Sequence, residues 1–232
     1  LPPEIRAYLD SVDAVYHYHA NDEELIDHIA DLIASEQVVG HFSDRAEFGP
    51  RALGSRSIIG DARSRKMQAT MNLKIKFRES FRPFAPAILR EHVDEYFEMR
   101  PDENSPYMLL VAPVQESKRL PVTEDGARGL DKLKQVRSCV PAITHVDYSA
   151  RVQTIDMQHH PRFYKIIERF KQKTGSPVVI NTSFNVRGEP IVNSPEDAFR
   201  CFMHTNMDAL VLENFVILKQ DQPNAKEIDI EA

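Results

Sequence analysis

The sequence has no tryptophan and only two cysteines among its 232 residues. Two thiols are too few for a disulfide framework, so we expect a reducing compartment, the cytoplasm. Cys201 lies in the apolar pattern AFRCFM, which is typical of a protein core. We expect both Cys201 and Cys139 to be unreactive, and the chemistry of the protein not to depend on sulfur.

No apolar run approaches the roughly 20 residues that cross a bilayer, and no secretory signal opens the chain. We therefore expect no membrane association. The first residues read LPPEIRAYLD and begin with Leu rather than Met, which we interpret as the trimmed end of something longer. With 42% hydrophobic residues, the chain can bury a substantial core.

Several familiar motifs are missing. The chain has no G-x-x-x-x-G-K-[ST] loop, no G-x-G-x-x-G fingerprint, and no H-E-x-x-H, C-x-x-C or G-x-S-x-G pattern. Its nine histidines lack the spacing of metal ligands. His145 and Asp147 alternate like two residues on one strand face, but we favour a structural role for them over a metal site.

Acidic residues outnumber basic ones overall, 35 to 29, but positive charge is concentrated in one stretch. The net charge is -6, yet the stretch from Arg45 to Arg90 holds eleven lysines and arginines against three acids, a local net of +8. A local positive field in an acidic protein suits a small anionic ligand better than a long polyanion. The composition therefore favours a pocket for a small anion.

Hydrophobic periodicity and end signals predict intermingled helices and strands without a strict βαβ rhythm. Helices are predicted at 22–36, 62–73, 92–98, 161–173 and 194–204, and strands at 37–42, 57–61, 84–89, 107–114, 140–155, 176–185 and 208–219. This pattern indicates an α/β (α+β) fold, a mixed twisted sheet with helices packed on it.

We divide the chain into an N-terminal lead-in and helix at 1–36, a main domain at 37–220, and a solvated tail at 221–232. Residues 115–137 are polar and show no sustained period. A loop of this length is a lid, a partner segment or disordered.

Arginines recur in polar, irregular stretches: GPRALGSRS, KIKFRESFR, HVDYSARVQT and NTSFNVRGEP. Guanidinium forks match phosphate oxygens, and N–H groups in bent loops add donors. If residues 74–78 are extended, Lys74, Lys76 and Arg78 share one face. In the last stretch, Asn181, Ser183 and Asn185 alternate just before Arg187.

Five cations sit in irregular or strand-end segments: Arg51, Lys76, Arg82, Arg151 and Arg187. Singly, each fits a surface ion pair as well as a ligand contact, but together they favour a phosphate site. Four others lie on predicted helix faces and fit surface pairs better: Arg63, Arg65, Lys66 and Arg90. For Arg56, a phosphate clamp and a buried ion pair both stay open.

The ordered stretches FGPRALGSRSIIGDAR, NLKIKFRESFRPFAPAIL, SPYMLLVAPV, PAITHVDYSARVQT, VVINTSFNVRGEPIV, SPEDAFRCF and DALVLENF carry a resemblance. From about Val38 to Phe215, the chain resembles the C-terminal domain of the nodulation-type and antibiotic O-carbamoyltransferases. The resemblance implies a YrdC-like fold that binds ATP, with Mg²⁺ on its phosphates, and carbamoyl phosphate.

The resemblance also implies formation of a carbamoyl-adenylate. A preceding actin-like domain, with Fe²⁺ or a similar metal held by an H-x-x-x-H pattern, then moves the carbamoyl group to a hydroxyl acceptor. This chain has no H-x-x-x-H, so we expect that partner domain to be absent from it, and no metal site here.

Functional residues follow from the matching positions. The resemblance implies catalytic roles for Lys76, Arg82 and Arg151. It implies that substrate and ATP are bound by these three together with Arg51, Arg56, Ser183, Asn185 and Arg187. The chain departs from the usual family motifs at two glycines, which are Tyr148 and Glu213 here.

Two alternatives stay open. A YrdC-like, non-catalytic RNA-binding module is one, although the acidity and the lack of aromatics that look exposed count against it. A structural partner domain that docks through 115–137 is the other. A homodimer is left open, and the acceptor cannot be named from this chain.

Overall fold

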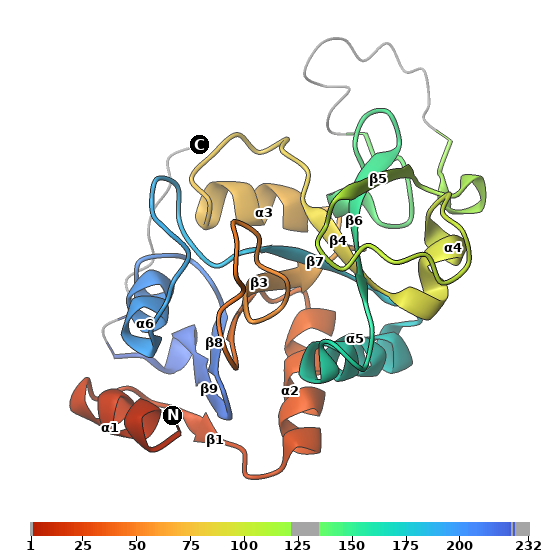
Figure 1. The fold of residues 1–232 in the computed structure, drawn as a ribbon. Helices are drawn as coiled ribbons and strands as arrows, with labels where there is room; N and C mark the ends of the chain where they lie inside the picture. The colour runs from red at the N-terminus through yellow and green to blue at the C-terminus, as the bar shows by residue number, and fades with distance from the viewer. Residues whose placement is uncertain (1, 122–134, 224, 226–232) are drawn as a thin grey trace.

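The structure, a computed structural model, describes residues 2–121, 135–223 and 225. A nine-stranded sheet runs through the described residues in the order β1-β9-β8-β2-β3-β7-β4-β6-β5 (Figure 1). The strands are β1 His17–Tyr18, β2 Val39–Phe42, β3 Arg56–Asp61, β4 Ala85–Leu89, β5 Leu110–Pro113, β6 Ser149–Ile155, β7 Val178–Ser183, β8 Ala209–Leu212 and β9 Phe215–Leu218. The helices are α1 Pro2–Ser11, α2 Asp22–Ala34, α3 Met67–Lys74, α4 Val93–Tyr96, α5 Pro161–Thr174 and α6 Pro195–Met203.

The sheet is mixed. Within the described ranges β2 pairs with β8 and β4 with β6 in parallel, and the other pairs are antiparallel. The α/β fold expected from the sequence is confirmed.

One end of the sheet is defined by strand register. Ser57 on β3 pairs with Ser183 on β7, and Asn181 on β7 pairs with Ala85 on β4. The starts of β3, β4 and β6 and the end of β7 therefore meet at one end of the sheet, which we call the arginine end.

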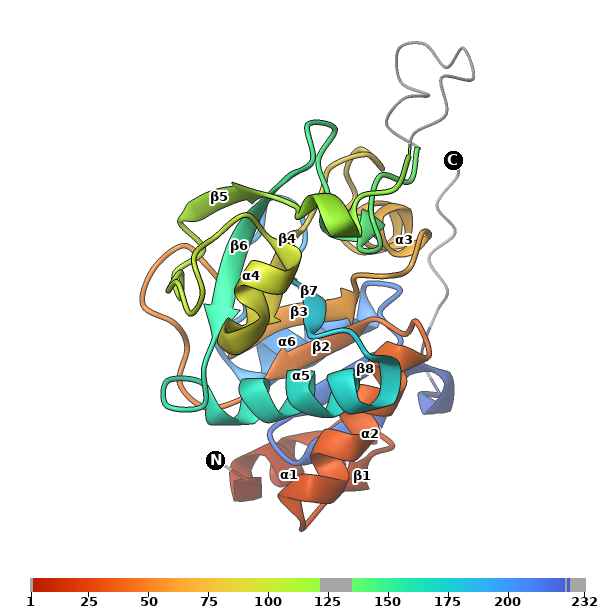
Figure 2. The same ribbon diagram turned by 90° about the vertical axis from the view of Figure 1, so that its right-hand side faces the viewer.

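Helices cover both faces of the sheet. α2 and α5 lie side by side on one face, where Ile29 and Phe170 pack with strand residues such as Ile59 (Figures 1 and 2). α1, α3, α4 and α6 pack on the other face, with Met71 and Phe202 fully buried. Each such side chain stabilises the fold by roughly 1.5–3 kcal/mol relative to exposure.

The helix ends follow the signals in the sequence. Asn21 caps α2 by accepting from the N–H of Glu23 at 2.9 Å. Ser194 and Asp197 form a capping box at the start of α6. Gly175 ends α5 in a left-handed conformation, with φ +78°, which a side chain would disfavour. In the sequence, either Asn21 or Asp22 could cap the first of these helices, and the structure selects Asn21, whereas Ser194 and Gly175 mark helix ends as their residue types predict.

Around α3 two predictions are wrong, the start of the helix and the extended segment after it, whereas its end at Lys74 lies one residue beyond the predicted end. The helix begins at Met67 rather than at residue 62, because the Asp61 carboxylate accepts from the N–H of Arg63 at 2.8 Å and holds a turn. Residues 74–78 are not extended. The N–H of Lys76 donates to Met71, and that of Arg78 donates to Asn72, so the chain continues to coil beyond the helix.

The segment before β6 also differs from expectation. His145 and Asp147 lie in a turn and not on a strand face, because the N–H of His145 donates to Ser149 and that of Tyr148 donates to His145. Tyr148 has φ +64°, and Glu213 has φ +52°. Both departures from the family motifs therefore occupy left-handed backbone, where glycine is least strained.

Part of the predicted loop 115–137 and most of the predicted tail 221–232 fall outside the described residues. The described parts of the loop form a short 3-10 helix, Glu116–Lys118, and a bridge between Arg119 and Ser138. The boundaries at residues 37 and 220 stay predictions. Across the described ranges, every helix is too short or too polar to span a bilayer.

Candidate functional site

The loop of residues 44–55, which we call the anion loop, lies over the arginine end of the sheet. One carboxylate holds it together from within: Glu47 Oε1 accepts from the N–H groups of Leu53 and Ser55, both at 2.7 Å. Ser43 N–H donates to the carbonyl of Ser55 at 3.0 Å and closes the neck of the loop. The sequence did not single out Glu47, although it stands beside the Gly-Pro-Arg turn.

Two buried amides on the sheet fix the far side of the loop. Asn181 donates to the carbonyl of Ala52 at 3.2 Å and to the Gln153 side chain at 2.6 Å. Gln153 in turn donates to the carbonyl of Leu53 at 2.8 Å. Because every acceptor is a carbonyl oxygen, the orientation of both amides is determined.

A fully buried histidine supports the loop from below. His41 Nδ1 lies 2.7 Å from the carbonyl of Gly54, so this nitrogen carries the proton. Burial lowers the pKa of His41 to about 4, and the ring is neutral. Gly54 has φ +135°, and a Cβ there would lie 2.6 Å from the Phe163 ring, so only glycine fits.

Arg56 points inward. Its Nη1 donates to the carbonyls of Ser43 and Ser55 at 2.9 and 3.0 Å, and its Nη2 to that of Asp44 at 3.1 Å. The guanidinium carbon lies 3.4 Å from the centroid of the Phe42 ring. These terminal nitrogens therefore bind the neck of the anion loop, and we interpret Arg56 as an anchor of the loop.

Arg51 and Arg151 point to a different role. Gln153, two residues after Arg151 on β6, donates to the carbonyl of Leu53, two residues after Arg51, so these segments of the loop and the strand are neighbours. Burial, and then the charge of Arg51, lower the pKa of Arg151. Arg51 is exposed, and Arg151 Nε is buried without a hydrogen-bond partner. Among the described residues, neither arginine forms an ion pair. Two like charges without a carboxylate are the arrangement expected of an anion site.

Lys76 is buried beneath the turn that follows β7. Its Nζ donates to the Ser183 carbonyl at 2.5 Å, and to the Asn185 carbonyl and side-chain oxygen at 2.8 and 2.9 Å. Burial, and then Arg78, lower its pKa to about 7. Lys76 therefore shapes the turn that carries Ser183 and Asn185, and its three protons are already engaged.

Arg82 and Arg187 both act electrostatically on the carboxylate of Glu79, but among the described residues only Arg82 forms an ion pair with it. Arg82 Nε pairs with Glu79 at 2.9 Å, and both side chains are about half exposed. The N–H of Glu79, then Arg82 and Arg187, lower the pKa of that carboxyl. Arg187 is exposed on a turn that Gly188 completes with φ +83°. Arg82 thus carries a surface ion pair, whereas Arg187 stays available.

The structure groups the predicted residues in two sets at the arginine end. Arg51 and Arg151 form one set, and the other contains Lys76, Arg82, Ser183, Asn185 and Arg187. β6 and β7 are two strands apart, which corresponds to roughly 10 Å. A hollow of about 390 Å³ lies away from both sets, at the β1 edge of the sheet, where it is lined by α1, Tyr18 and Phe215. A single cavity that joins both sets stays a prediction.

Several aromatic side chains of the described residues are exposed, contrary to the expectation from sequence, among them Phe81 beside Arg82. Phe48, three residues before Arg51, is fully exposed, and Tyr107 is 64% exposed. Met108, next to Tyr107, packs with Leu53 of the anion loop. Across the described chain, no group of three or more His, Cys, Asp or Glu side chains is arranged to hold a metal ion.

Comparison with known proteins gives a consistent result. The family described as Carbamoyltransferase C-terminus matches residues 30–219. An uncharacterized protein of Synechocystis is 56% identical over 228 residues, which are 97% of this chain and 37% of that protein. Nodulation protein NolO of Bradyrhizobium diazoefficiens is 38% identical over 200 residues, which are 85% of this chain and 33% of that protein.

A solved structure shares the fold. Full-length HypF, in a phosphate- and nucleotide-bound form, aligns over 88% of this chain and 23% of its own, with a TM-score of 0.52 and 15% identity. The chain spans only 37% and 33% of the two relatives in sequence.

Proposed function

Because this chain belongs to the carbamoyltransferase C-terminal family, we propose that it makes a carbamoyl-adenylate from ATP and carbamoyl phosphate. Another part of the enzyme, an actin-like domain with its own metal, would transfer the carbamoyl group to a hydroxyl acceptor. The likeness of the chain to part of longer nodulation proteins supports this division.

The proposed chemistry has two steps. Water cleaves carbamoyl phosphate into carbamate and inorganic phosphate. A carbamate oxygen then attacks the α-phosphorus of ATP, and the bond to the bridging oxygen breaks, so that pyrophosphate leaves with the electron pair. No covalent protein intermediate is needed, because both steps require chiefly that mutually repelling anions be held in line.

The observation that carries the proposal is that Arg51 and Arg151 lie on neighbouring segments and that, among the described residues, neither forms an ion pair with a carboxylate. Their charges would neutralise phosphate oxygens on one side of the site, and Arg187 would do so on the other. Ser183 and Asn185 offer polar atoms on the turn that Lys76 fixes. Mg²⁺ would arrive with ATP as part of the substrate.

Pyrophosphate release from ATP and carbamoyl phosphate tests the proposal. Arg151→Ala should reduce the rate at least about 100-fold, the size of effect seen when a charge-stabilising donor is removed. Arg169→Ala is the matched control, because Arg169 on α5 pairs with Asp27 at 2.7 Å. Equal rates for wild type and Arg151→Ala would contradict the assigned site.

The exposed Phe48 beside Arg51 gives one reason to keep RNA binding as a second candidate. A nucleic-acid module should bind polynucleotides with an affinity that falls steeply with salt, and should release no pyrophosphate. Titration of a single-stranded oligonucleotide at two salt concentrations separates the two candidates.

A further inference from the structure

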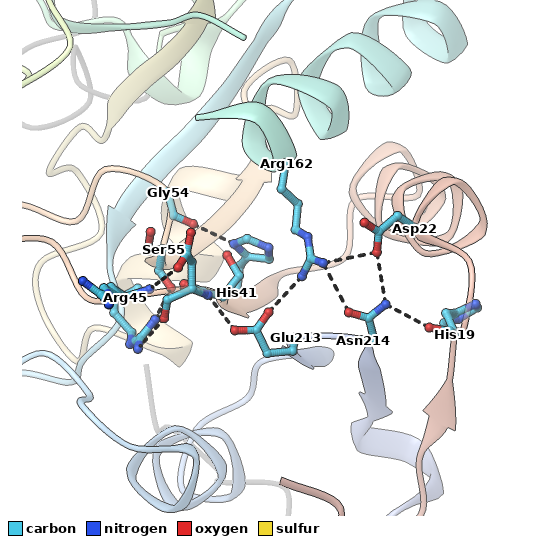
Figure 3. A network of polar contacts seen from close by, with 12 residues as sticks. His19, Asp22, His41, Arg45, Gly54, Ser55, Arg162, Glu213 and Asn214 are labelled. Atoms are coloured by element: carbon cyan, nitrogen blue, oxygen red, sulfur yellow. Dashed lines mark hydrogen bonds and ion pairs between the residues drawn. The ribbon is translucent and has the colours of Figure 1, made fainter. Parts of the chain in front are cut away.

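A carboxylate from the β8–β9 hairpin lies against the first residue of the anion loop. Glu213 Oε1 accepts from the N–H of Asp44 at 2.6 Å, and its Oε2 pairs with Arg162 at 3.0 Å (Figure 3). The Glu213 side chain is only 13% exposed. We infer that Glu213 is a positioning residue that sets the entry of the anion loop and so the place of Arg51. The inference rests on the proposed function for its link to binding.

The backbone at Glu213 is unfavourable without these contacts. Its φ of +52° lies in the left-handed region, which residues other than glycine and asparagine seldom adopt. The conformation directs the carboxylate toward Asp44 and Arg162. Persistence of a strained residue requires surroundings that hold it, and here both carboxylate oxygens have a partner.

Two helices hold the other side of Glu213. Arg162, in the first turn of α5, also reaches the side chains of Asp22 and Asn214, both at 3.2 Å. Asn214 donates to the carbonyl of His19 at 2.9 Å and to Asp22 at 3.1 Å (Figure 3). The carboxylate is therefore fixed relative to α2, α5 and the hairpin.

Asp44 is clamped from both of its backbone groups. Its N–H donates to Glu213, and its carbonyl accepts from Arg56 at 3.1 Å. Asp44 itself has φ +55°, so the loop turns sharply at this residue. Residues 52–54 are held separately by Asn181, Gln153 and His41, so a shift of Asp44 acts on the part of the loop between it and Arg51.

Amide hydrogen exchange of the ligand-free protein tests the positioning directly. Glu213→Gly should speed exchange of the amides of 44–55 at least tenfold. Glu213→Gln should have a smaller effect, because its amide oxygen still accepts from Asp44. Glu23→Gln is the matched control: Glu23 also pairs with an α5 arginine, Arg169, yet no contact joins it to the loop. It should leave the exchange at the wild-type rate.

Steady-state pyrophosphate release tests the link to binding. Glu213→Gly should raise KM for ATP about tenfold with kcat within twofold of wild type. Glu213→Gln should have a KM for ATP close to that of wild type. Unchanged loop exchange in both variants would overturn the inference, and so would faster exchange with unchanged KM. If Glu213→Gly fails to fold, Glu213→Gln alone decides by the same two readouts. If even wild type releases no pyrophosphate, the proposed function fails while exchange still decides the positioning.

Discussion

Lysine and arginine side chains have different partners in two regions of this molecule. Along the seam between α2 and α5, each basic side chain faces an acid: Arg162 with Asp22, Lys165 with Glu23, Arg169 with Glu23 and Asp27, and Lys173 with Asp27 and Asp31. At the arginine end, Arg82 pairs with Glu79, but Arg51 and Arg151 form no ion pair among the described residues, and Lys76 donates to neutral oxygens. The number of cations does not distinguish the two regions, whereas the lack of acidic partners at Arg51, Arg151 and Lys76 among the described residues does.

The energetic meaning of the two regions differs as well. Exposed ion pairs are typically worth 0.2–1 kcal/mol and weaken with salt. Buried groups without a charged partner, such as His41 and Lys76, have pKa values displaced by burial, so protonation of these groups changes the stability of the protein. The following experiments separate the seam from the arginine end on this basis.

The largest effect is expected from acid, through His41. Its pKa is about 4 in the folded protein and near 6.5 in the unfolded chain. As the pH falls between these values, the unfolded chain binds a proton that the folded protein does not, so stability falls by up to about 3 kcal/mol. Urea unfolding at pH 7 and pH 4 measures this loss, and His41→Gln should show a correspondingly smaller one. An equal loss in the variant would contradict it.

Alkali should act through Lys76, in the opposite direction. Its pKa is about 7 when folded and near 10.5 when unfolded. Between pH 7 and pH 9 the folded protein loses the proton that the unfolded chain keeps, so stability rises by about 2 kcal/mol. Urea unfolding of Lys76→Met should lack this rise. The idea fails if the variant gains as much stability as wild type.

Removal of an unpaired cation should affect ligand binding more than removal of a paired one. Arg51→Ala should weaken ATP binding about tenfold, or about 1.4 kcal/mol, because it removes a charge that no acid offsets. Lys165→Ala, which removes a seam cation, should change it less than twofold. Isothermal titration of both variants measures the difference, and equal effects would erase the distinction between the regions.

The smallest effect is expected at the seam itself. Lys173 pairs with Asp27 at 2.9 Å and Asp31 at 2.7 Å, both about half exposed. Lys173→Met should lower stability by less than about 1 kcal/mol in low salt, and most of the difference should be lost near 1 M salt, where the Debye length falls to about 3 Å. A loss that persists in high salt would indicate packing rather than charge.

Local signals made much of this molecule predictable. Asn21, Ser194 and Gly175 mark helix ends, and they act through neighbouring backbone groups, so the chain nearby suffices to interpret them. The family matches confirm the resemblance inferred from the motifs. Arg51 and Arg151 could be named because each interrupts a regular pattern.

The rest depended on contacts distant in sequence. His41 and Gln153 lie inside buried strands, where no local pattern reveals that their partners are carbonyls of the anion loop. Lys76 was expected on an extended face, but its partners lie more than a hundred residues away. A charge pattern identifies such residues without telling which of them turn inward.

The two arginines of GPRALGSRS face opposite ways, one toward solvent and one into the protein. A substitution at Arg56 would therefore lower activity in the same way as one at Arg51, but through displacement of the loop that Arg56 anchors. Genetic screens that score only lost activity would count both positions alike. Thermal melting measured alongside each assay would distinguish a substitution at Arg51, which removes an exposed cation, from one at Arg56, which removes an anchor of the loop.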